Sequence, residues 1–250
     1  PKGKGTVIVK HANPCGVSVK NNNLESYKSA LSCDPISAFG GIVSCNFKIT
    51  KNLALELNKL FLEVIIANGF ESSAIKILKA KKNLRLIDGT NYTSEELLKF
   101  VSFNQNIMIQ SEDLNLFSTK NFKIVSKRKP TSKQLKDLIF AFNVCRYVKS
   151  NAIVLASNET TVGIGSGQPS RLDSCQIAIN KMKKFNLQND NLVAASDAFF
   201  PFVDGIEKLV QSGVRAVVQP SGSIRDKEII NFANETDTVL LFSKTRHFRH

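Results

Sequence analysis

The stretch VIVKHANPCG, from Val7 to Gly16, holds the first residues whose types and spacing could do chemistry. A run of β-branched residues predicts a strand that ends at Lys10 and His11. A histidine can act as a general base, and the positive charge of a lysine beside it favours the neutral imidazole that a base needs. The alternative is a structural histidine where a strand runs into a turn at Pro14-Cys15-Gly16. The stretch alone leaves both readings open.

Cys15 raises the question of a metal site. A zinc-dependent deaminase needs a histidine or cysteine ligand, a nearby glutamate and a Pro-Cys-x-x-Cys pair. Here no glutamate lies two residues after His11, and Cys15 is followed by Gly-Val-Ser. The five cysteines contain no CxxC pair, and their odd number argues against a disulfide framework. We therefore expect no zinc, buried apolar cysteines, and a reducing, cytoplasmic location.

Two glycine-containing turns precede helices further along the chain. They are GIGSGQPSR (Gly163–Arg171) and PSGSIRD (Pro220–Asp226), and each could present backbone N–H groups to an anion at a helix N-terminus. The first is not a dinucleotide-binding fingerprint, because its third glycine is missing. It is not a phosphate-binding P-loop either, because the Gly-Lys-Ser/Thr ending is absent. Each turn is a candidate carboxylate or phosphate site, or simply the cap of a helix.

Apolar spacing predicts that strands and helices alternate through the first part of the chain. The expected elements are a strand at Thr6–Ala12, a helix at Leu24–Ser32, a strand at Gly41–Phe47, a helix at Thr50–Phe61 with Thr50 as its N-cap, a strand at Glu63–Phe70 and a helix at Glu71–Lys82. The stretch from Asn83 to Lys129 is less regular, and we expect a peripheral connecting region there.

The last part of the chain is clearer. Thr131 and Gln134 predict a capping box at the start of an amphipathic helix, and Asn158-Glu159 predicts the turn of a β-hairpin. Three helix–strand pairs should follow: helices at Ser170–Phe185, Phe202–Ser212 (closed by Gly213) and Arg225–Glu235, and strands at Val193–Ala198, Arg215–Pro220 and Thr238–Ser243.

This order of elements predicts a largely parallel sheet covered by helices, in three α/β/α layers. Ligands of such sheets gather at the carboxyl ends of the strands. The polar stretches that follow the expected strands should therefore build the site: Lys10-His11, Ser166–Arg171, Asp197–Asp204, Ser221–Arg225 and Arg246–His250.

The chain of 250 residues carries 34 lysines and arginines against 21 acidic residues, a net charge of +13. This charge favours anionic partners, and a basic nucleic-acid-binding domain is the alternative function. The lysine-rich runs Lys76–Arg85 and Lys123–Pro130 lack interleaved aromatics, so we expect a solvated surface and no nucleic acid. No apolar run reaches the length of a membrane span, so we expect no membrane partner.

Several stretches together resemble a known family. In chain order they are KHANPCG, DPISAFGGIV, EVIIANGF, YVKSNAIVLA, GIGSGQPSR, SDAFFPFVDG, QPSGSIRD and the terminal RHFRH. They resemble the formyltransferase domain of the bifunctional purine biosynthesis proteins, in which 5-aminoimidazole-4-carboxamide ribonucleotide (AICAR) formyltransferase is fused to IMP cyclohydrolase. The resemblance implies tandem cytidine-deaminase-like α/β/α units without zinc: a partial first unit at 1–82, a connecting region at 83–129 and a second unit at 130–250.

The implied reaction moves a formyl group from the co-substrate 10-formyltetrahydrofolate to the 5-amino group of AICAR, on the route to IMP. By the resemblance, His11 accepts the proton, Lys10 stabilises the transition state, and Asn151 binds the substrate and helps to position His11. Other positions that match nucleotide or folate contacts of the family are Gly40, Glu63, Arg171, Phe199, Asp204, Ser223, Ile224 and Arg246.

The resemblance also has departures. The family carries the cyclohydrolase and an Arg-Tyr-containing nucleotide-binding segment upstream, and these 250 residues contain neither. We therefore expect a truncated product that is inactive or poorly folded alone. Pro169 and Asn68 differ from many members, and we expect these loop changes to be tolerated. The resemblance further implies a homodimer with the active site at its interface, and it allows a structural monovalent cation.

Overall fold

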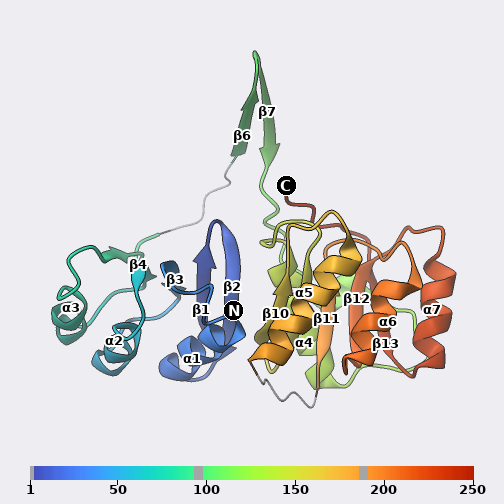
Figure 1. Ribbon diagram of the computed structural model, residues 1–250, viewed down its shortest axis with the longest axis horizontal. Helices are drawn as coiled ribbons and strands as arrows, with labels where there is room; N and C mark the ends of the chain where they lie inside the picture. Colours follow the sequence, from blue (N-terminus) through green and yellow to red (C-terminus); the bar gives the residue numbers. More distant parts are fainter. Residues whose placement is uncertain (1–2, 93–97, 186–190) are drawn as a thin grey trace.

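The computed structural model describes residues 3–92, 98–185 and 191–250. Its centre is a single sheet of 11 strands in the order β5-β4-β3-β1-β2-β10-β9-β11-β12-β13-β8 (Figure 1). The expected α/β class is confirmed. The sheet is mixed rather than largely parallel, because each half contains an antiparallel hairpin and the two halves meet antiparallel at β2 and β10.

The first half of the sheet begins with a hairpin and continues with three helix–strand pairs. The elements are β1 (Lys4–Lys10), β2 (Asn13–Lys20), α1 (Asn23–Cys33), β3 (Gly41–Cys45), α2 (Lys51–Leu57), β4 (Leu62–Ala67), α3 (Ser72–Leu78) and β5 (Arg85–Asp88). Local chemistry sets the helix starts. The Asn22 side chain accepts from the first turn of α1, and Thr50, the expected N-cap, accepts from the backbone N–H of Leu53.

The second half repeats this order after one additional helix. The elements are α4 (Ser132–Cys145), β9 (Ile153–Ser157), β10 (Thr160–Gly165), α5 (Arg171–Lys184), β11 (Val193–Ser196), α6 (Val203–Gln211), β12 (Ala216–Pro220), α7 (Asp226–Glu235) and β13 (Val239–Ser243). The capping box of Thr131 and Gln134 is present, and Ser170 caps α5 as expected. The turn at Asn158-Glu159 has positive φ at both residues, which matches the twist of a two-residue hairpin.

The two halves are related by a pseudo-two-fold axis. In each half three strands are parallel, and the hairpin strand beside them is antiparallel. A Cβ atom on Gly16 in β2 would lie 1.9 Å from the backbone oxygen of Ala30 in α1, and one on Gly165 in β10 would lie 1.9 Å from that of Ser174 in α5. The same close approach of helix to hairpin therefore occurs in both halves.

The two halves differ in their layers. In the second half, α5–α7 cover one face of the sheet and α4 covers the other, so the three expected layers are present. In the first half, α1–α3 pack on one face, around Ile8, Val43 and Ile65 (Figure 1). Among the described residues no helix covers the opposite face of β1 and β3.

The expected turn at Pro14-Cys15-Gly16 is wrong. These residues lie within β2, and the turn is formed by His11 and Ala12, with φ of 51° and 60°. Two-residue turns with positive φ usually contain glycine or asparagine. Neither His11 nor Ala12 is one of these residues, so the sequence does not mark the turn. Gly16 serves instead as the point of contact with α1.

The middle of the chain does more than connect. β5 forms one edge of the main sheet, and β8 (Phe122–Ile124), which follows a short 3₁₀ turn at Thr119–Asn121, forms the other. Between them β6 (Leu98–Phe103) and β7 (Asn106–Ser111) form a separate hairpin that projects from the body of the protein (Figure 1). Within the described parts of the chain, no helix is long and apolar enough to cross a membrane.

Candidate active site

His11 is exposed at the tip of the β1–β2 hairpin, in a two-residue turn closed by the pairing of Lys10 with Asn13. Positive φ at both turn residues matches the twist of a two-residue hairpin, as it does at Asn158-Glu159. The fold therefore holds the imidazole out at one edge of the sheet instead of burying it, which disfavours the purely structural reading.

Lys10 points toward the start of β3 and β4. Its Nζ donates to the backbone oxygen of Phe39 at 2.8 Å, and the Phe39 and Phe61 rings lie 5.2 Å apart. Gly40 has φ of 71°, and a Cβ there would lie 3.7 Å from the Phe61 ring. Glu63 is exposed two residues after Phe61. Four residues singled out in the sequence, Lys10, His11, Gly40 and Glu63, thus lie at the same end of β1, β3 and β4.

Asn13 connects this turn to the second half of the sheet. Its Nδ2 donates to Ser166 Oγ at 3.2 Å, and its Oδ1 accepts from the backbone N–H of Lys149 at 3.0 Å. A cavity of about 320 Å³ lies beside the turn, lined by Lys10 and His11 from one half and by Ser166 and Lys181 from the other. The turn is therefore fixed directly against the segment that leads to Asn151.

An ion pair crosses the same cavity. Lys181 of α5 lies 2.7 Å from the carboxylate of Asp34, which follows α1. Burial opposes ionisation of Asp34, but the hydrogen bonds from Lys181 and Ser37 outweigh it, and the pKa of the carboxyl is lowered. Burial, reinforced by Asp34, raises the pKa of the neighbouring Cys15 thiol. Cys15 is therefore held in the neutral form, which is a poor metal ligand.

The remaining cysteines are also free and buried. Burial raises the pKa of Cys33, Cys45 and Cys175 to about 12. Across residues 3–92, 98–185 and 191–250, no three histidine, cysteine or acidic side chains are grouped so that they could hold a metal ion.

Asn151 lies just before β9, in a network with Arg171. Its Nδ2 donates to the backbone oxygens of Gln168 and Pro169, each at 2.9 Å, and its Oδ1 accepts from Arg171 Nη2 at 2.6 Å. The Ser150–Asn151 peptide bond is cis. The glycine-rich turn thus supplies the backbone groups that orient the Asn151 side chain.

Arg171 is buried, and its guanidinium faces the protein. Nη1 donates to Asp197 at 2.5 Å and to Ser196 Oγ at 2.8 Å. Asp197 is fully buried, and its other oxygen accepts from Ser150 Oγ at 2.6 Å. This ion pair fixes the start of β9 against the end of β11. The sequence singled out Arg171 and placed the stretch from Asp197 to Asp204 at the site, but it gave no sign that Asp197 would pair with Arg171 or that Ser150 would take part.

A second group lies at the carboxyl ends of β11, β12 and β13. The Arg246 guanidinium lies over the Phe199 ring at 4.7 Å from its centre. A Cβ on Gly222 would lie 3.5 Å from Arg246 Nη2, and the next turn residue but one, Ile224, is fully exposed. Together these residues form an exposed platform with an aromatic face and a cation, suited to a planar, anionic ligand.

Ser223 and Asp204 complete this group. The Ser223 hydroxyl accepts from the backbone N–H of Arg225, and Asp204 lies in the first turn of α6, where its carboxylate accepts from the N–H of Gly205 at 2.7 Å. Arg225 in turn lies over the Phe202 ring. The polar stretches that the sequence placed together after the strands therefore do lie at the same end of the sheet's strands.

The residues along this edge are spread over many strands. From β1, which ends at Lys10, to β11, which precedes Phe199, there are four strand spacings, roughly 20 Å at about 4.8 Å each. The described residues therefore give two groups, the turn at His11 and the platform of Phe199 and Arg246, and Asn151, which precedes β9, lies between them.

The fold and the residues at this end of the strands describe an α/β protein with an exposed histidine beside a half-buried lysine, and with polar, cationic residues suited to an anionic substrate. The family model of the AICARFT/IMPCHase bienzyme matches residues 2–181. The chain belongs to the AICARFT/IMPCHase bienzyme family.

Individual curated relatives support the same family assignment. The chain is 48% identical over 247 residues to the bifunctional purine biosynthesis protein PurH of Buchnera aphidicola subsp. Schizaphis graminum, a match that covers 98% of this chain and 47% of the relative. Proteins of the same name from Persephonella marina and Aquifex aeolicus are each 44% identical, over 98% and 97% of this chain and 47% of each relative. The chain spans about half the length of the curated relatives it matches.

Proposed function

We propose that this chain is the formyltransferase half of a bifunctional purine biosynthesis enzyme. It transfers the formyl group of 10-formyltetrahydrofolate to the 5-amino group of AICAR, giving formyl-AICAR on the route to IMP. The relatives are named for bifunctional purine biosynthesis, and we assign the IMP cyclohydrolase to the part of them that this chain does not match. The observation that carries the proposal is His11, which is exposed in the turn directly after Lys10 and is held through Asn13 against Ser166 and Lys149.

In the proposed mechanism the AICAR nitrogen attacks the formyl carbon while His11 takes a proton from that nitrogen. The carbonyl oxygen becomes an oxyanion, and Lys10, whose Nζ lies at the same end of the hairpin, stabilises it. The bond from the formyl carbon to the folate nitrogen then breaks, and that nitrogen receives the proton. Asn151, which Arg171 orients, binds the substrate and keeps it close to His11.

The remaining matched residues bind the two substrates in this proposal. Gly40 and Glu63 contact the nucleotide beside Lys10, while the platform of Phe199 and Arg246 receives a flat, anionic group, and Asp204, Ser223 and Ile224 surround it. Arg171 takes part through Asn151, since its own guanidinium is engaged with Asp197. Because this arginine balances the charge of Asp197, we assign no monovalent cation there.

We further propose two deaminase-like units at 1–82 and 130–250, joined by 83–129, and a cytoplasmic location.

The first test is the replacement of His11. His11→Ala should abolish formyl transfer from 10-formyltetrahydrofolate to AICAR, measured as tetrahydrofolate formed, because no other group would accept the proton. Asn158→Ala is the matched control, since Asn158 has the same positive φ in the corresponding turn of the second hairpin, at the opposite edge of the sheet. Full activity of His11→Ala, or equal loss in the control, would refute the assignment of the base. Salt-sensitive binding to arbitrary DNA without any effect of AICAR would favour the nucleic-acid alternative.

We propose that the enzyme is a homodimer whose active sites lie at the interface. The separation of roughly 20 Å between the His11 turn and the Phe199 platform supports this, because a second copy can bring its own platform to the turn. Mixing His11→Ala with Arg246→Ala, after dissociation and reassociation, should restore part of the activity that each variant lacks. If each active site is built within one chain, mixing the two variants should restore no activity.

A further inference from the structure

Lys10 is held from outside its own hairpin, by the turn that connects α1 to β3 (residues 34–40). Its Nζ donates to the backbone oxygen of Phe39 at 2.8 Å. An ammonium group has three N–H donors, and the one that binds this carbonyl fixes the directions of the other two. In the proposed reaction one of those two stabilises the oxyanion. The position of the Phe39 carbonyl therefore sets how well Lys10 meets the formyl oxygen.

Asp34 fixes the start of this turn. Its side chain is buried, and its two carboxylate oxygens accept from the backbone N–H of Ser37 at 2.9 Å and from the Ser37 hydroxyl at 2.7 Å. Its backbone oxygen accepts from the N–H of Ala38 at 3.1 Å. Ala38 directly precedes Phe39, so these bonds leave the Phe39 carbonyl little freedom to move.

The end of the turn is fixed separately. Gly40 N–H donates to the backbone oxygen of Phe61 at 2.9 Å, and the N–H of the next residue donates to that of Ala38 at 3.0 Å. These bonds are made by the main chain and remain in side-chain variants of the turn. Asp34 and Ser37 are the only polar side chains from residue 34 to residue 40, so their contribution can be removed by substitution.

The Asp34 carboxylate is itself held from the second half of the sheet. Lys181 of α5 lies 2.7 Å from it, and both residues line the cavity of about 320 Å³ beside the His11 turn, together with Lys10. Burial raises the pKa of Asp34, but the hydrogen bonds from Lys181 and Ser37 outweigh it and leave the carboxyl ionised at neutral pH. The contacts thus run from α5 through Asp34 and the turn to Lys10.

We propose that Asp34 is the positioning residue for Lys10. It fixes the turn whose Phe39 carbonyl directs the ammonium, and Lys181 keeps its carboxylate in place from the other half of the sheet. The proposal rests on the proposed formyl transfer, which gives Lys10 its role, and Asp34 is assigned no contact with either substrate. The alternative is an ion pair that only joins the two halves. In that case the loss of Asp34 would affect stability and not Lys10 in particular.

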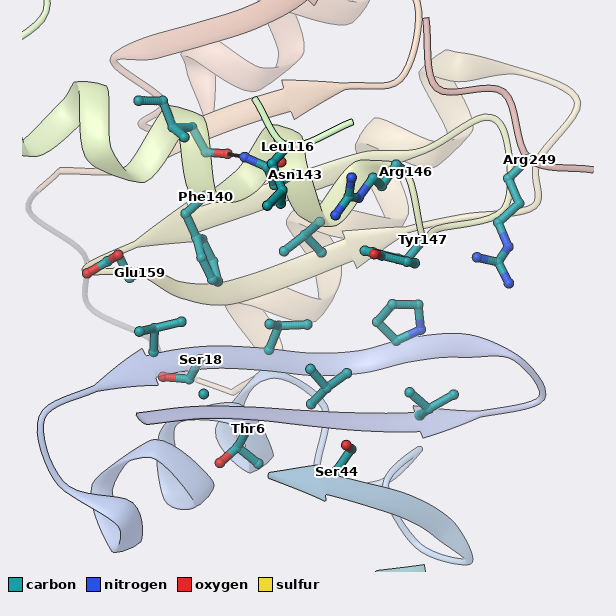
Figure 2. A pocket seen from close by; sticks show the side chains of 18 of the residues that line it. Thr6, Ser18, Ser44, Leu116, Phe140, Asn143, Arg146, Tyr147, Glu159 and Arg249 are labelled. Carbon is teal, nitrogen blue, oxygen red and sulfur yellow. Dashed lines mark hydrogen bonds between the residues drawn. The ribbon is translucent and has the colours of Figure 1, made fainter. Parts of the chain in front are cut away.

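The protein contains a matched arrangement at the opposite end of the strands. The buried carboxylate of Asp137 accepts from the backbone N–H groups of Asn158 and Glu159, at 2.9 Å and 2.6 Å. Lys20 Nζ donates to the backbone oxygen of Asn158 at 2.6 Å. Figure 2 shows Glu159 beside the end of β2 that lies away from the β1–β2 turn. Asp137 and Lys20 therefore provide a control pair, in which an aspartate also holds the carbonyl that binds a lysine.

The first test measures the freedom of Lys10 and does not need formyl transfer. The 250-residue protein is treated with a limiting amount of an acetylating reagent, and the acetylation rates of Lys10 and Lys20 are followed by mass spectrometry. Asp34→Ala should raise the rate at Lys10 by about fivefold, as for the loss of one hydrogen bond, and leave the rate at Lys20 unchanged. Asp137→Ala should do the reverse. Ser37→Ala removes a single hydroxyl and should act in the same direction as Asp34→Ala, so it makes the same test if that variant does not fold.

The second test measures formyl transfer from 10-formyltetrahydrofolate to AICAR. Asp34→Ala should lower kcat by about tenfold or more with KM little changed, because a small displacement of a catalytic group is costly in the transition state. Asp34→Asn keeps an oxygen that accepts from the Ser37 N–H, so it should recover part of this loss. Asp137→Ala should lower the melting temperature to a similar degree and leave kcat unchanged.

Two results would overturn the proposal. One is an unchanged acetylation rate of Lys10 in both Asp34→Ala and Ser37→Ala. The other is an equal loss of kcat in Asp34→Ala and Asp137→Ala, which would leave Asp34 with a purely structural role. If the native protein shows no formyl transfer while Asp34→Ala still speeds the acetylation of Lys10, the proposed function fails and the positioning of Lys10 by Asp34 stands.

Discussion

At the scale of single residues, Asn13 is the side chain that ties the His11 turn to the Asn151 segment. Asn13→Ala removes its bonds to Ser166 and Lys149, so the turn gains freedom and the base loses its position relative to the substrate. If His11 is the base, we expect kcat to fall by about tenfold to a hundredfold with KM little changed, because small displacements of a catalytic group are costly. The free energy of unfolding should fall by about 1 kcal/mol.

Asn46 provides the control for Asn13. Its side chain also makes two hydrogen bonds, accepting from Gly5 N–H and donating to the Gly3 oxygen, at the other end of β1. Asn46→Ala should cost similar stability and leave kcat unchanged. Equal losses of kcat in the two variants would show that Asn13 acts only through the stability of the hairpin.

The sequence identified the Lys10-His11 pair at a strand end but misplaced the turn beside it. Pro14-Cys15-Gly16 has the composition of a turn, and composition is a fair guide only where no tertiary contact competes. Here Gly16 is required for the close approach of α1, so the turn moved to His11-Ala12. The stretch that begins at Asp197 was placed at the site, but its pairing with Arg171 was not predicted, since a buried ion pair joins residues that are far apart in the sequence.

At the scale of elements, the contact between each hairpin and its helix depends on glycine. Gly16→Ala would place a methyl group 1.9 Å from the Ala30 oxygen, so α1 must shift from β2. We expect a loss of about 3 kcal/mol in the free energy of unfolding by denaturant titration, as for overpacked cores. In Gly89→Ala the added carbon would meet its nearest neighbour at an ordinary 3.6 Å, so that variant should change stability by less than about 0.5 kcal/mol.

Gly165→Ala tests whether the two halves are alike. Its methyl group would lie 1.9 Å from the Ser174 oxygen in α5, and we expect a loss similar to that of Gly16→Ala. A neutral result at either position would mean that the helices are not held at this distance in solution.

Elements whose ends are set locally, such as the capping box at Thr131 and the turn at Asn158-Glu159, were predictable. The edge strands β5 and β8 were not, because their short segments gain order only by pairing with the sheet.

At the scale of the whole molecule, the sequence predicted the hairpin and the three helix–strand pairs of the second half, but it predicted neither the hairpin of the first half nor the single sheet. The join rests on β2 and β10, where Ser18 pairs with Thr160 across 142 residues, and such pairing depends on tertiary structure rather than on propensity. The buried hydroxyl contact between these residues and the ion pair of Asp34 with Lys181 hold the halves together. Neither half presents the candidate site without the other.

The C-terminal segment closes this assembly through His247, and its chemistry predicts a dependence of stability on pH. The His247 side chain is fully buried against the rings of Phe117 and Phe142, and its Nδ1 contacts Asp113 at 2.5 Å. Burial lowers the pKa of His247 below its usual value, although Asp113 acts in the opposite direction; Arg146 also lowers it and Asp197 raises it. The folded protein therefore prefers the neutral imidazole.

Because the pKa of His247 is lower in the folded than in the unfolded chain, its contribution to stability is complete above about pH 6.5, the ordinary value of histidine. That contribution is lost as the pH falls through the folded pKa, since the unfolded chain binds the proton more readily. Denaturant unfolding between pH 8 and pH 5 should show this loss in the native protein and in His250→Gln, which alters an exposed histidine. His247→Phe keeps an aromatic ring beside Phe142 and has no proton to bind, so it should flatten the profile. If the unfolding free energy of His247→Phe falls with pH as steeply as that of the native protein, the titrating group is not His247.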